Sequence, residues 1–232
     1  HLSEAVNGEH ASNLGALLAD MVVGQIPGAR AYIVDPVVVD ELEAVARLSG
    51  HPLISRRSIF HALNQKAVAR IYAASVGKEY EDLNLIVAHM GGGISVGAHR
   101  RGRVIDVNNA LNGDGPYSPE RSGGLPALQL AELCFSGKYK LSEVTSMLAG
   151  KGGVVAYLGT NSFQEATKRA VDGDTHAALI VEGCSYQTSR EIGAMSAVLA
   201  GEVDCIILTG GLAYDSAHVE RVSHRVRHLA PI

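Results

Sequence analysis

The residues best suited to chemistry lie in the stretch HMGGGISVGAHRRGRVIDV, which begins at His89. Three consecutive glycines, Gly91, Gly92 and Gly93, separate two β-rich runs. Glycine lets the backbone adopt positive φ and approach a ligand closely, so that successive amides can hold phosphate oxygens. His89 and Ser95 flank the turn and could supply a donor and a hydroxyl group. The alternative is a tight hairpin that simply requires glycine.

A second glycine turn occurs in LTGGLAYDS, where Gly210, Gly211 and Leu212 follow the apolar run DCIILT. A helix is predicted to begin directly afterwards, and a helix amino terminus favours negative charge. Such a turn is typical of nucleotide sites. Its spacing matches neither a Walker loop nor a dinucleotide fingerprint. Two such turns, each after a buried strand, support one another.

Arg121 lies in the loop NNALNGDGPYSPERSGGLP, which is too long and too rich in glycine to be a simple connection. A guanidinium group recognises phosphate or carboxylate with two parallel hydrogen bonds. The alternative is a surface ion pair with Glu120 or Asp114.

His61 and Asp35 are two further candidates. His61 follows two arginines in RRSIFH, and it could donate to a phosphoryl oxygen or cap a helix. Asp35 ends the apolar run YIVD, and it could face a cleft or cap the helix that Pro36 is expected to start.

Composition limits the class of protein. The chain has 232 residues, of which 47% are hydrophobic and 19% charged, enough for a sizeable core. The net charge of −4 argues against a general grip on nucleic acid or on an anionic membrane. No apolar run approaches the roughly 20 residues that span a bilayer. Three widely spaced cysteines follow no metal-ligand pattern, so we expect reduced thiols.

The hydrophobic periodicity predicts an α/β protein with an antiparallel edge. Three consecutive strands are expected at 85–89, 94–98 and 103–107, and a fourth at 204–209. Another short strand is expected at 31–34. Helices are expected at 13–23, 36–48, 58–74, 127–136, 141–149, 162–171, 176–200 and 216–228. The last residues, HLAPI, have the character of a strand start.

The sequence blocks carry a family resemblance. GEHASNLGA, IVDPVVVDEL, RRSIFH, HMGGGISVGAHRRGRVIDVNNAL, GPYSPERSGGLP and LTGGLAYDS occur in the order and approximate spacing of the butyrate kinases. The chain therefore resembles this branch of the acetate kinase family, within the actin/hexokinase-like ATPase superfamily.

The resemblance implies an α/β protein with a ribonuclease H-like (actin-like ATPase) fold, in which helices flank a mixed sheet with an antiparallel meander. Residues 1–50 would be the remnant of the first, amino-terminal lobe and the inter-lobe segment. Residues 51–232 would form the second, nucleotide-binding lobe, truncated at its end. The chain starts at His1 without an initiator Met. We therefore expect a part of a longer protein.

The resemblance also implies roles for the candidates. Asp35 would orient the carboxylate or the metal, His61 would contact the transferring phosphoryl group, and Arg121 would stabilise its charge. Gly91–Gly93 would form a phosphate loop, and Gly210–Leu212 would lie against the adenosine. The cofactors would be ATP/ADP and Mg²⁺.

The implied function is reversible phosphoryl transfer between ATP and butyrate, or a branched analogue, giving butyryl phosphate and ADP. The enzyme would be cytoplasmic and homo-oligomeric, with a small carboxylate or acyl phosphate as its partner and neither nucleic acid nor membrane. The alternatives are an acetate or propionate kinase and a non-catalytic ATP-binding sensor on the same fold.

Overall fold

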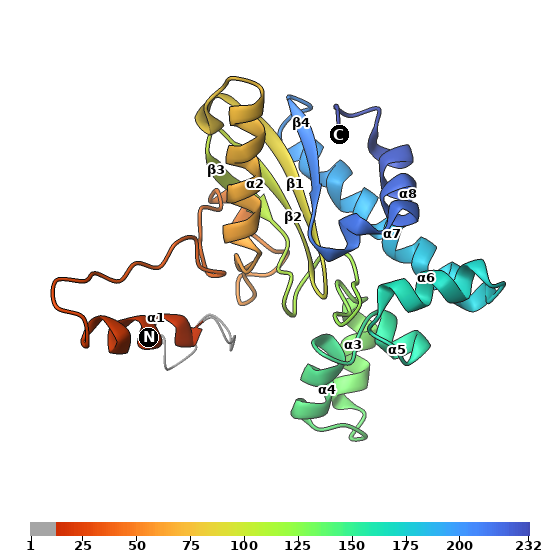
Figure 1. Ribbon diagram of the computed structural model, residues 1–232. Coiled ribbons are helices and arrows are strands. Elements are labelled where there is room, and N and C mark those ends of the chain that lie inside the picture. The colour runs from red at the N-terminus through yellow and green to blue at the C-terminus, as the bar shows by residue number, and fades with distance from the viewer. Residues whose placement is uncertain (1–12) are drawn as a thin grey trace.

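The structure, a computed structural model, describes residues 13–232. Its centre is a four-stranded sheet in the order β3-β2-β1-β4 (Figure 1). The strands are β1 (Asn84–Met90), β2 (Ile94–Arg100), β3 (Arg103–Val107) and β4 (Cys205–Thr209). The first three form an antiparallel meander, and β4 pairs in parallel with β1. This mixed sheet confirms the α/β fold class and four of the five predicted strands, those expected at 85–89, 94–98, 103–107 and 204–209.

Eight α-helices occur in the described residues. They are α1 (Asn13–Val23), α2 (Ala62–Ser75), α3 (Ala127–Phe135), α4 (Leu141–Leu148), α5 (Val154–Leu158), α6 (Phe163–Val171), α7 (Thr175–Val198) and α8 (Ser216–Val226). Short 3-10 turns are η1 (Val45–Arg47), η2 (Tyr80–Asp82) and η3 (Gly211–Tyr214). All helices predicted after residue 57 are present, but α2 begins four residues late, and α5 was not predicted.

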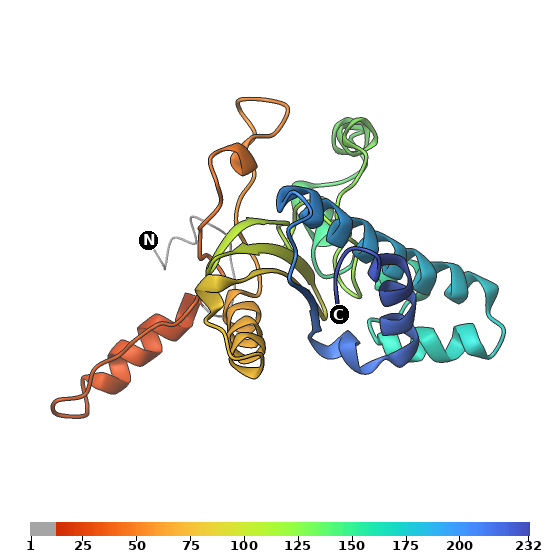
Figure 2. The same ribbon diagram turned by 90° about the horizontal axis from the view of Figure 1, so that it is seen from above.

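The sheet is covered by helices on both faces, with α2 on one and α7 and α8 on the other (Figures 1 and 2). Ile86, Ala88 and Met90 of β1 join the core beneath α7, whereas Leu85 and Val87 pack towards α2. Successive side chains of a strand point to opposite faces. Since both faces of β1 are buried, its middle, Leu85–Ala88, is a continuous apolar run.

Side-chain caps explain why three helices start as predicted. Ser162 accepts a hydrogen bond from the backbone N–H of Glu165 at the start of α6. Asp174 and Asp215 do the same for α7 and α8. Each cap satisfies an amide that the first turn of a helix leaves unpaired.

The expected strand at 31–34 and helix at 36–48 do not form; only η1 is helical there. The cause is tertiary. Backbone groups of this segment form hydrogen bonds with other parts of the chain. The carbonyl of Val37 accepts from the N–H of Phe60 at 3.1 Å. The N–H of Glu43 donates to Ile105 of β3 at 3.0 Å. These bonds replace the i to i−4 ladder of a helix.

The two ends of the described chain differ. Helix α1 stands apart from the sheet (Figure 1). His10, in the block GEHASN, lies outside the described residues. At the other end, the N–H of Ile206 donates to the carbonyl of Pro231 at 2.8 Å, so the last residues run beside β4 although no strand is assigned.

The cysteines and the lengths of the apolar helices in residues 13–232 bear on the expectations of reduced thiols and of no membrane span. Cys134 is exposed, Cys184 and Cys205 are buried, and all three are free thiols, as predicted. Burial raises the pKa of Cys184 to about 12, so this thiol is unreactive. No helix in this range is long and apolar enough to cross a bilayer.

Candidate active site

His61 sits at the amino terminus of α2, where its side chain makes no cap for the helix. Its Nδ1 lies 2.8 Å from Oγ of Ser95, at the start of β2. Its ring stacks on that of His89, with centroids 3.8 Å apart and planes 10° apart. The capping alternative is therefore wrong, and His61 instead meets His89 and Ser95, the two residues that flank the first glycine turn.

His89 is held from its other side. Its Nδ1 lies 2.7 Å from Oδ1 of Asn64 on α2. Burial lowers the pKa of His89 to about 4, so the ring is neutral at pH 7. A neutral ring with Nδ1 donating to Asn64 offers a lone pair at Nε2, near Gly91.

The Gly91–Gly93 turn joins β1 to β2 and is closed by a hydrogen bond from the N–H of Gly91 to the carbonyl of Gly93, at 3.0 Å. Its middle carbonyl, on Gly92, accepts from the Oγ of Ser118 at 2.6 Å and from the N–H of Glu120 at 3.2 Å. The loop that carries Arg121 is thereby bound directly to the glycine turn.

Gly93 is required for close approach. A Cβ at this position would lie 2.9 Å from the carbonyl oxygen of Ala110 and 3.6 Å from Cε1 of His61. Real Cβ atoms essentially never come within 3.0 Å of a backbone atom. The glycine therefore lets three separate segments of chain meet at one point.

The guanidinium group of Arg121 makes few hydrogen bonds to the described residues. Its Nη1 donates to the carbonyl of Glu120 at 3.3 Å, and the nearest carboxylate oxygen, Oε2 of Glu120, is 3.9 Å away. Its Nε is buried, and within residues 13–232 it has no hydrogen-bond partner. The alternative of a surface pair with Glu120 is thus weak. A buried donor without an acceptor favours an anion at this position.

His61, Gly93 and Arg121 line one cavity of about 100 Å³. The rest of its lining is mainly apolar and consists of Val37, Ile59, Phe60, Ala110 and Leu111. Two nitrogen-bearing side chains at an apolar hollow can hold a small anion that carries an apolar tail.

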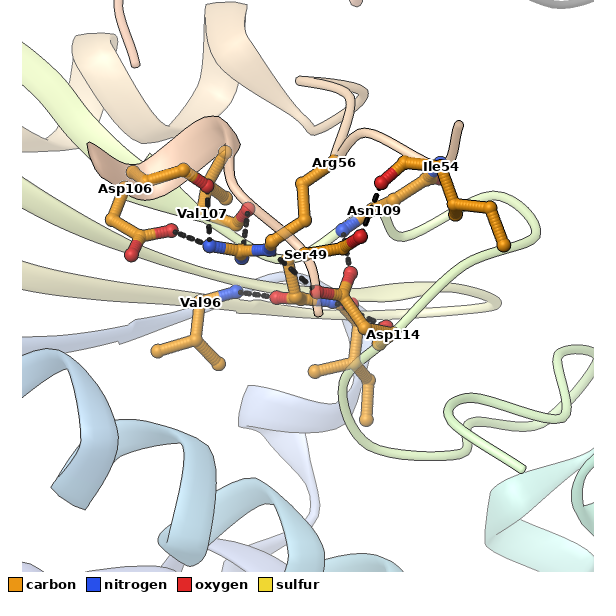
Figure 3. Close-up of polar contacts among 11 residues, drawn as sticks. Ser49, Ile54, Arg56, Val96, Asp106, Val107, Asn109 and Asp114 are labelled. Carbon is orange, nitrogen blue, oxygen red and sulfur yellow. Dashed lines mark hydrogen bonds and ion pairs between the residues drawn. The ribbon is translucent and has the colours of Figure 1, made fainter. Parts of the chain in front are cut away.

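Arg56 fixes the loop that supplies two of these lining residues (Figure 3). Its Nη1 donates to Oδ1 of Asp106 at 2.8 Å, and its Nε donates to Oδ2 of Asp114 at 3.0 Å. Asp114 also accepts from the N–H of Asn109 at 2.8 Å. Asn108 donates from Nδ2 to the carbonyl of Ile94 at 3.0 Å, so the loop is tied to β2 as well.

The second glycine turn lies beside the first. β1 and β4 are parallel neighbours, with His89 opposite Thr209, so their carboxyl ends share an edge of the sheet. Gly210 has φ of 88°, and a Cβ there would be 2.5 Å from the carbonyl oxygen of Met90. Only glycine fits this turn.

Gly211 and Leu212 border a separate cavity of about 410 Å³ with residues of α6 and α8. Its other lining residues are Phe163, Gln164, Thr167, Tyr214, Asp215, Ser216 and Ala217. Each of the two glycine turns thus borders a hollow at this edge of the sheet.

Asp35 is not among the residues that line either cavity. Its Oδ2 accepts from Nη1 of Arg70 at 3.3 Å, and its φ is 42°. The structure therefore brings His61 and Arg121 together but pairs Asp35 elsewhere.

Sequence reasoning missed the residues that support the site. Arg56, Asn64 and Asn108 gave no separate signal, because each works through partners that are distant in the chain. The position of Arg56 in the RRSIFH block was the one available hint. Among residues 13–232, no group of three His, Cys, Asp or Glu side chains is placed to hold a metal ion.

Solved structures resemble the fold closely. The acetate kinase of Porphyromonas gingivalis has a TM-score of 0.85 at 21% identity, covering 98% of this chain and 60% of that one. The acetate kinase of Entamoeba histolytica has a TM-score of 0.81 at 16% identity, covering 98% and 62%. At such identities the likeness establishes the fold alone.

Curated relatives are much closer in sequence. Butyrate kinase 1 of Clostridium acetobutylicum is 57% identical over 231 residues, covering 100% of this chain and 65% of that protein. A probable butyrate kinase of Phocaeicola vulgatus is 56% identical over 224 residues, covering 97% and 63%. The chain spans less than two thirds of the length of these relatives. The profile of the acetokinase family matches residues 32–230, and the chain belongs to that family.

Proposed function

We propose that the protein catalyses reversible phosphoryl transfer between ATP and butyrate, or a branched analogue of butyrate. The observation that carries the proposal is the convergence of His61, Gly93 and Arg121 on one small, mainly apolar cavity. The similarity to proteins named butyrate kinases supports the choice of acid.

In this proposal the acyl tail lies against the apolar lining, which includes Phe60 and Leu111. The carboxylate is already ionised at neutral pH, so its oxygen can attack the γ-phosphorus without a general base. One O–P bond forms to the carboxylate while the bond from phosphorus to the β,γ-bridging oxygen breaks, and ADP leaves with that oxygen.

The transition state of such a transfer is loose and anionic, so catalysis rests on positioning and on charge stabilisation. Arg121 would supply N–H donors and positive charge, and His61 a further donor, to the oxygens of the moving group. The Gly91–Gly93 turn would hold phosphate oxygens through its backbone. Ser95 and His89 would keep His61 in place.

The nucleotide would occupy the larger hollow beside Gly210–Leu212, with its phosphates directed along the sheet edge towards Gly91–Gly93. The amino terminus of α8 borders this hollow through Ser216 and Ala217 and favours negative charge. The base would contact the exposed ring of Tyr214 at the rim.

Mg²⁺ is retained in the proposal as a partner of the nucleotide, since it is usually bound by one or two carboxylates together with substrate phosphates. The described residues do not by themselves form a metal site. No step is therefore assigned to the ion. A role for Asp35 in orienting the carboxylate or the metal requires it to leave Arg70.

Two organisational expectations are part of the proposal. Residues 1–50 would belong to the first lobe and the inter-lobe segment, and residues 51–232 to the nucleotide-binding lobe. The whole enzyme would be cytoplasmic and a homo-oligomer, and light scattering of the purified protein would measure its oligomeric state.

The test is a coupled assay of ADP formation, run on the protein extended to the length of its relatives. Acetate, propionate, butyrate and isobutyrate are supplied in turn. We expect the highest kcat/KM with butyrate or isobutyrate. A preference for acetate or propionate would reassign the substrate. Tight nucleotide binding without acyl phosphate formation from any acid would favour the sensor alternative.

A further inference from the structure

A chain of buried polar groups leads away from the cavity behind His61. Oγ of Ser95 contacts Nδ1 of His61 at 2.8 Å and Nε2 of Gln65 at 2.8 Å. Oε1 of Gln65 lies 3.0 Å from Nε2 of His99, and Nδ1 of His99 lies 2.6 Å from the hydroxyl of Tyr80. Ser95, Gln65 and His99 are fully buried, and Tyr80 is nearly so.

The direction of every hydrogen bond in this chain follows from one carbonyl group. Nε2 of Gln65 also lies 3.0 Å from the backbone oxygen of Ser95, which can only accept. The amide nitrogen of Gln65 must therefore face Ser95, and its oxygen must face His99. His99 then donates from Nε2 and accepts from Tyr80 at Nδ1.

The two end groups are compatible with these directions. Burial, with a smaller contribution from Lys66, lowers the pKa of His99 to about 3, so its ring carries a single proton at pH 7. Burial raises the pKa of Tyr80, which keeps its hydroxyl proton available to donate. No member of the chain has to be charged.

The hydrogen bonds of Ser95 likewise determine which ring nitrogen of His61 carries the proton. Oγ of Ser95 accepts from Gln65, and its second lone pair faces the backbone N–H of His61 at 3.4 Å. A hydroxyl that already accepts twice must use its own proton on the remaining neighbour, Nδ1 of His61. Nδ1 is then an acceptor, and in the neutral ring the proton resides on Nε2.

Gly97 makes the arrangement possible. A Cβ at this position of β2 would lie 2.5 Å from Oε1 of Gln65 and 3.1 Å from Nε2 of His99. Any other residue would displace the amide. A buried polar chain is costly unless all of its members are paired, and an apolar core would fill the same space more simply.

We propose that Gln65 is a positioning residue, which acts through Ser95 to hold His61 as the tautomer with its proton on Nε2. Gln65 does not line the cavity. The proposal rests on the proposed function in one respect: an N–H at Nε2 is what His61 would need in order to donate to a phosphoryl oxygen. The tautomer itself can be measured without turnover.

The experiment is two-bond ¹H–¹⁵N correlation NMR of the ¹⁵N-histidine-labelled protein, which reads the protonation of each ring nitrogen; His61→Gln assigns the signals. The unsubstituted protein should show Nε2 of His61 protonated and Nδ1 bare. Gln65→Glu keeps the shape and, as the carboxylate, removes the amide donor, so the Ser95 hydroxyl can donate to residue 65 and accept from His61. We expect the tautomer to invert to Nδ1–H.

Gln187→Glu is the matched control. Gln187 accepts from the N–H of Tyr117 through Oε1, at 3.0 Å, which a carboxylate also does. It has no contact with the chain from Tyr80 to His61. If Gln65→Glu does not fold, Gln65→Met keeps the test open, and it should give a mixture of both tautomers.

Two results would overturn the proposal: Nδ1–H in the unsubstituted protein, or an unchanged His61 signal in both folded Gln65 variants. In the active enzyme, Gln65→Glu should lower kcat by on the order of 10²-fold with KM for ATP little changed. An inverted tautomer with undiminished turnover would instead refute the role of His61 in the proposed function, so the two failures are distinguishable.

Discussion

At the scale of single residues, the surroundings of Arg121 indicate most clearly that the side chain binds a ligand. It lies in a cavity with its Nε buried, and its nearest carboxylate oxygen is 3.9 Å away. The only close partner of its guanidinium among the described residues is the carbonyl of the preceding residue, Glu120. We expect this poorly paired guanidinium to interact most strongly with the negative charge that develops on the phosphoryl oxygens in the transition state.

Arg121→Lys should therefore lower kcat on the order of 10²–10³-fold, or roughly 3–4 kcal/mol, although the charge is retained. Lysine is a point charge and does not reproduce two parallel N–H bonds. KM for ATP should change little, because the interaction matters most in the transition state. Steady-state kinetics of the active enzyme measure both constants.

Arg103→Lys, an exchange at an exposed arginine of β3, is the control and should have normal kinetics. Near-normal turnover by a folded Arg121→Lys enzyme would remove Arg121 from the site. A surface pair would predict at most about 1 kcal/mol of stability and no kinetic defect.

Glu191 on α7 is a second residue with a testable consequence. Burial, and secondarily the charge of Asp114, raises the pKa of Glu191 from 4.5 to about 7. The folded protein then binds more protons than the unfolded chain between about pH 4.5 and pH 7, so this residue makes stability fall as pH rises through that window. Glu191→Gln should add about 1–3 kcal/mol at pH 8 and little at pH 4.5.

Urea unfolding of Glu191→Gln at the two pH values measures this difference. Glu202→Gln, at an exposed glutamate, is the control. An equal change at both pH values would mean that Glu191 ionises normally in the folded protein.

Several of the residues that matter could be found from the sequence because their types are rare in their contexts. Three glycines between two β runs, and an arginine between glycine-rich stretches, already indicated an anion site. The partners of Arg56 and Gln65 could not be found this way. Arg56 meets Asp106 and Asp114, 50 and 58 positions away, and Gln65 meets Ser95, 30 positions away.

At the scale of elements, the loop that carries Arg121 depends on a packed contact with the start of α5. Gly153, directly before α5, has φ of 73°, and a Cβ there would lie 1.9 Å from the carbonyl oxygen of Ser118. The N–H of Val154 donates to that same oxygen at 3.0 Å. The glycine therefore lets α5 hold the Ser118–Arg121 segment.

Gly153→Ala should lower the free energy of unfolding by about 3 kcal/mol or more, from overpacking added to the cost of positive φ. Gly159→Ala is the control for positive φ, since Gly159 also has φ of 73°, although its ψ is 4° where that of Gly153 is −141°, and an added Cβ there would meet nothing within 4 Å. It should cost only about 1 kcal/mol. The two variants are compared by denaturant unfolding.

Equal losses from the two substitutions would show that the contact between residue 153 and the carbonyl of Ser118 adds nothing to the cost of positive φ. A lower kcat for Gly153→Ala, measured under conditions where the variant is fully folded, would show that displacing the loop also displaces Arg121.

Elements were predictable where their own periodicity agrees with their packing. The runs Leu85–Ala88 of β1 and Cys205–Leu208 of β4 are apolar because helices cover both faces of the sheet, and the caps Asp174 and Asp215 mark the starts of α7 and α8. The prediction was wrong at 31–48. There the carbonyl of Val37 and the N–H of Glu43 bond to distant chain, which no local pattern reveals.

At the scale of the whole molecule, the stability of the fold is linked to pH through three histidines. Burial lowers the pKa of His99 to about 3 and the pKa values of His89 and His218 to about 4. In an unfolded chain each would titrate near 6.5. Between pH 6.5 and about 4 the unfolded chain therefore binds more protons than the folded protein, and stability falls as pH falls.

The size of the effect follows from counting protons. Three histidines give a slope of at most about 4 kcal/mol per pH unit, and Glu191, which titrates in the opposite sense, removes about a third of it. The histidines dominate, so the protein should be clearly less stable at pH 5 than at pH 7. Urea unfolding midpoints at constant ionic strength measure the difference.

His218→Asn separates this linkage from general acid destabilisation. His218 is fully buried, with its Nδ1 2.9 Å from Oγ of Ser185, and an asparagine amide can still reach that hydroxyl. The substitution should leave a shallower pH dependence, by up to about 1.4 kcal/mol per pH unit, whatever it costs at pH 7. His228→Asn, at an exposed histidine, should leave the slope unchanged. A His218→Asn protein with the original slope would show that His218 takes up its proton without unfolding, and that the acid sensitivity of the fold arises elsewhere.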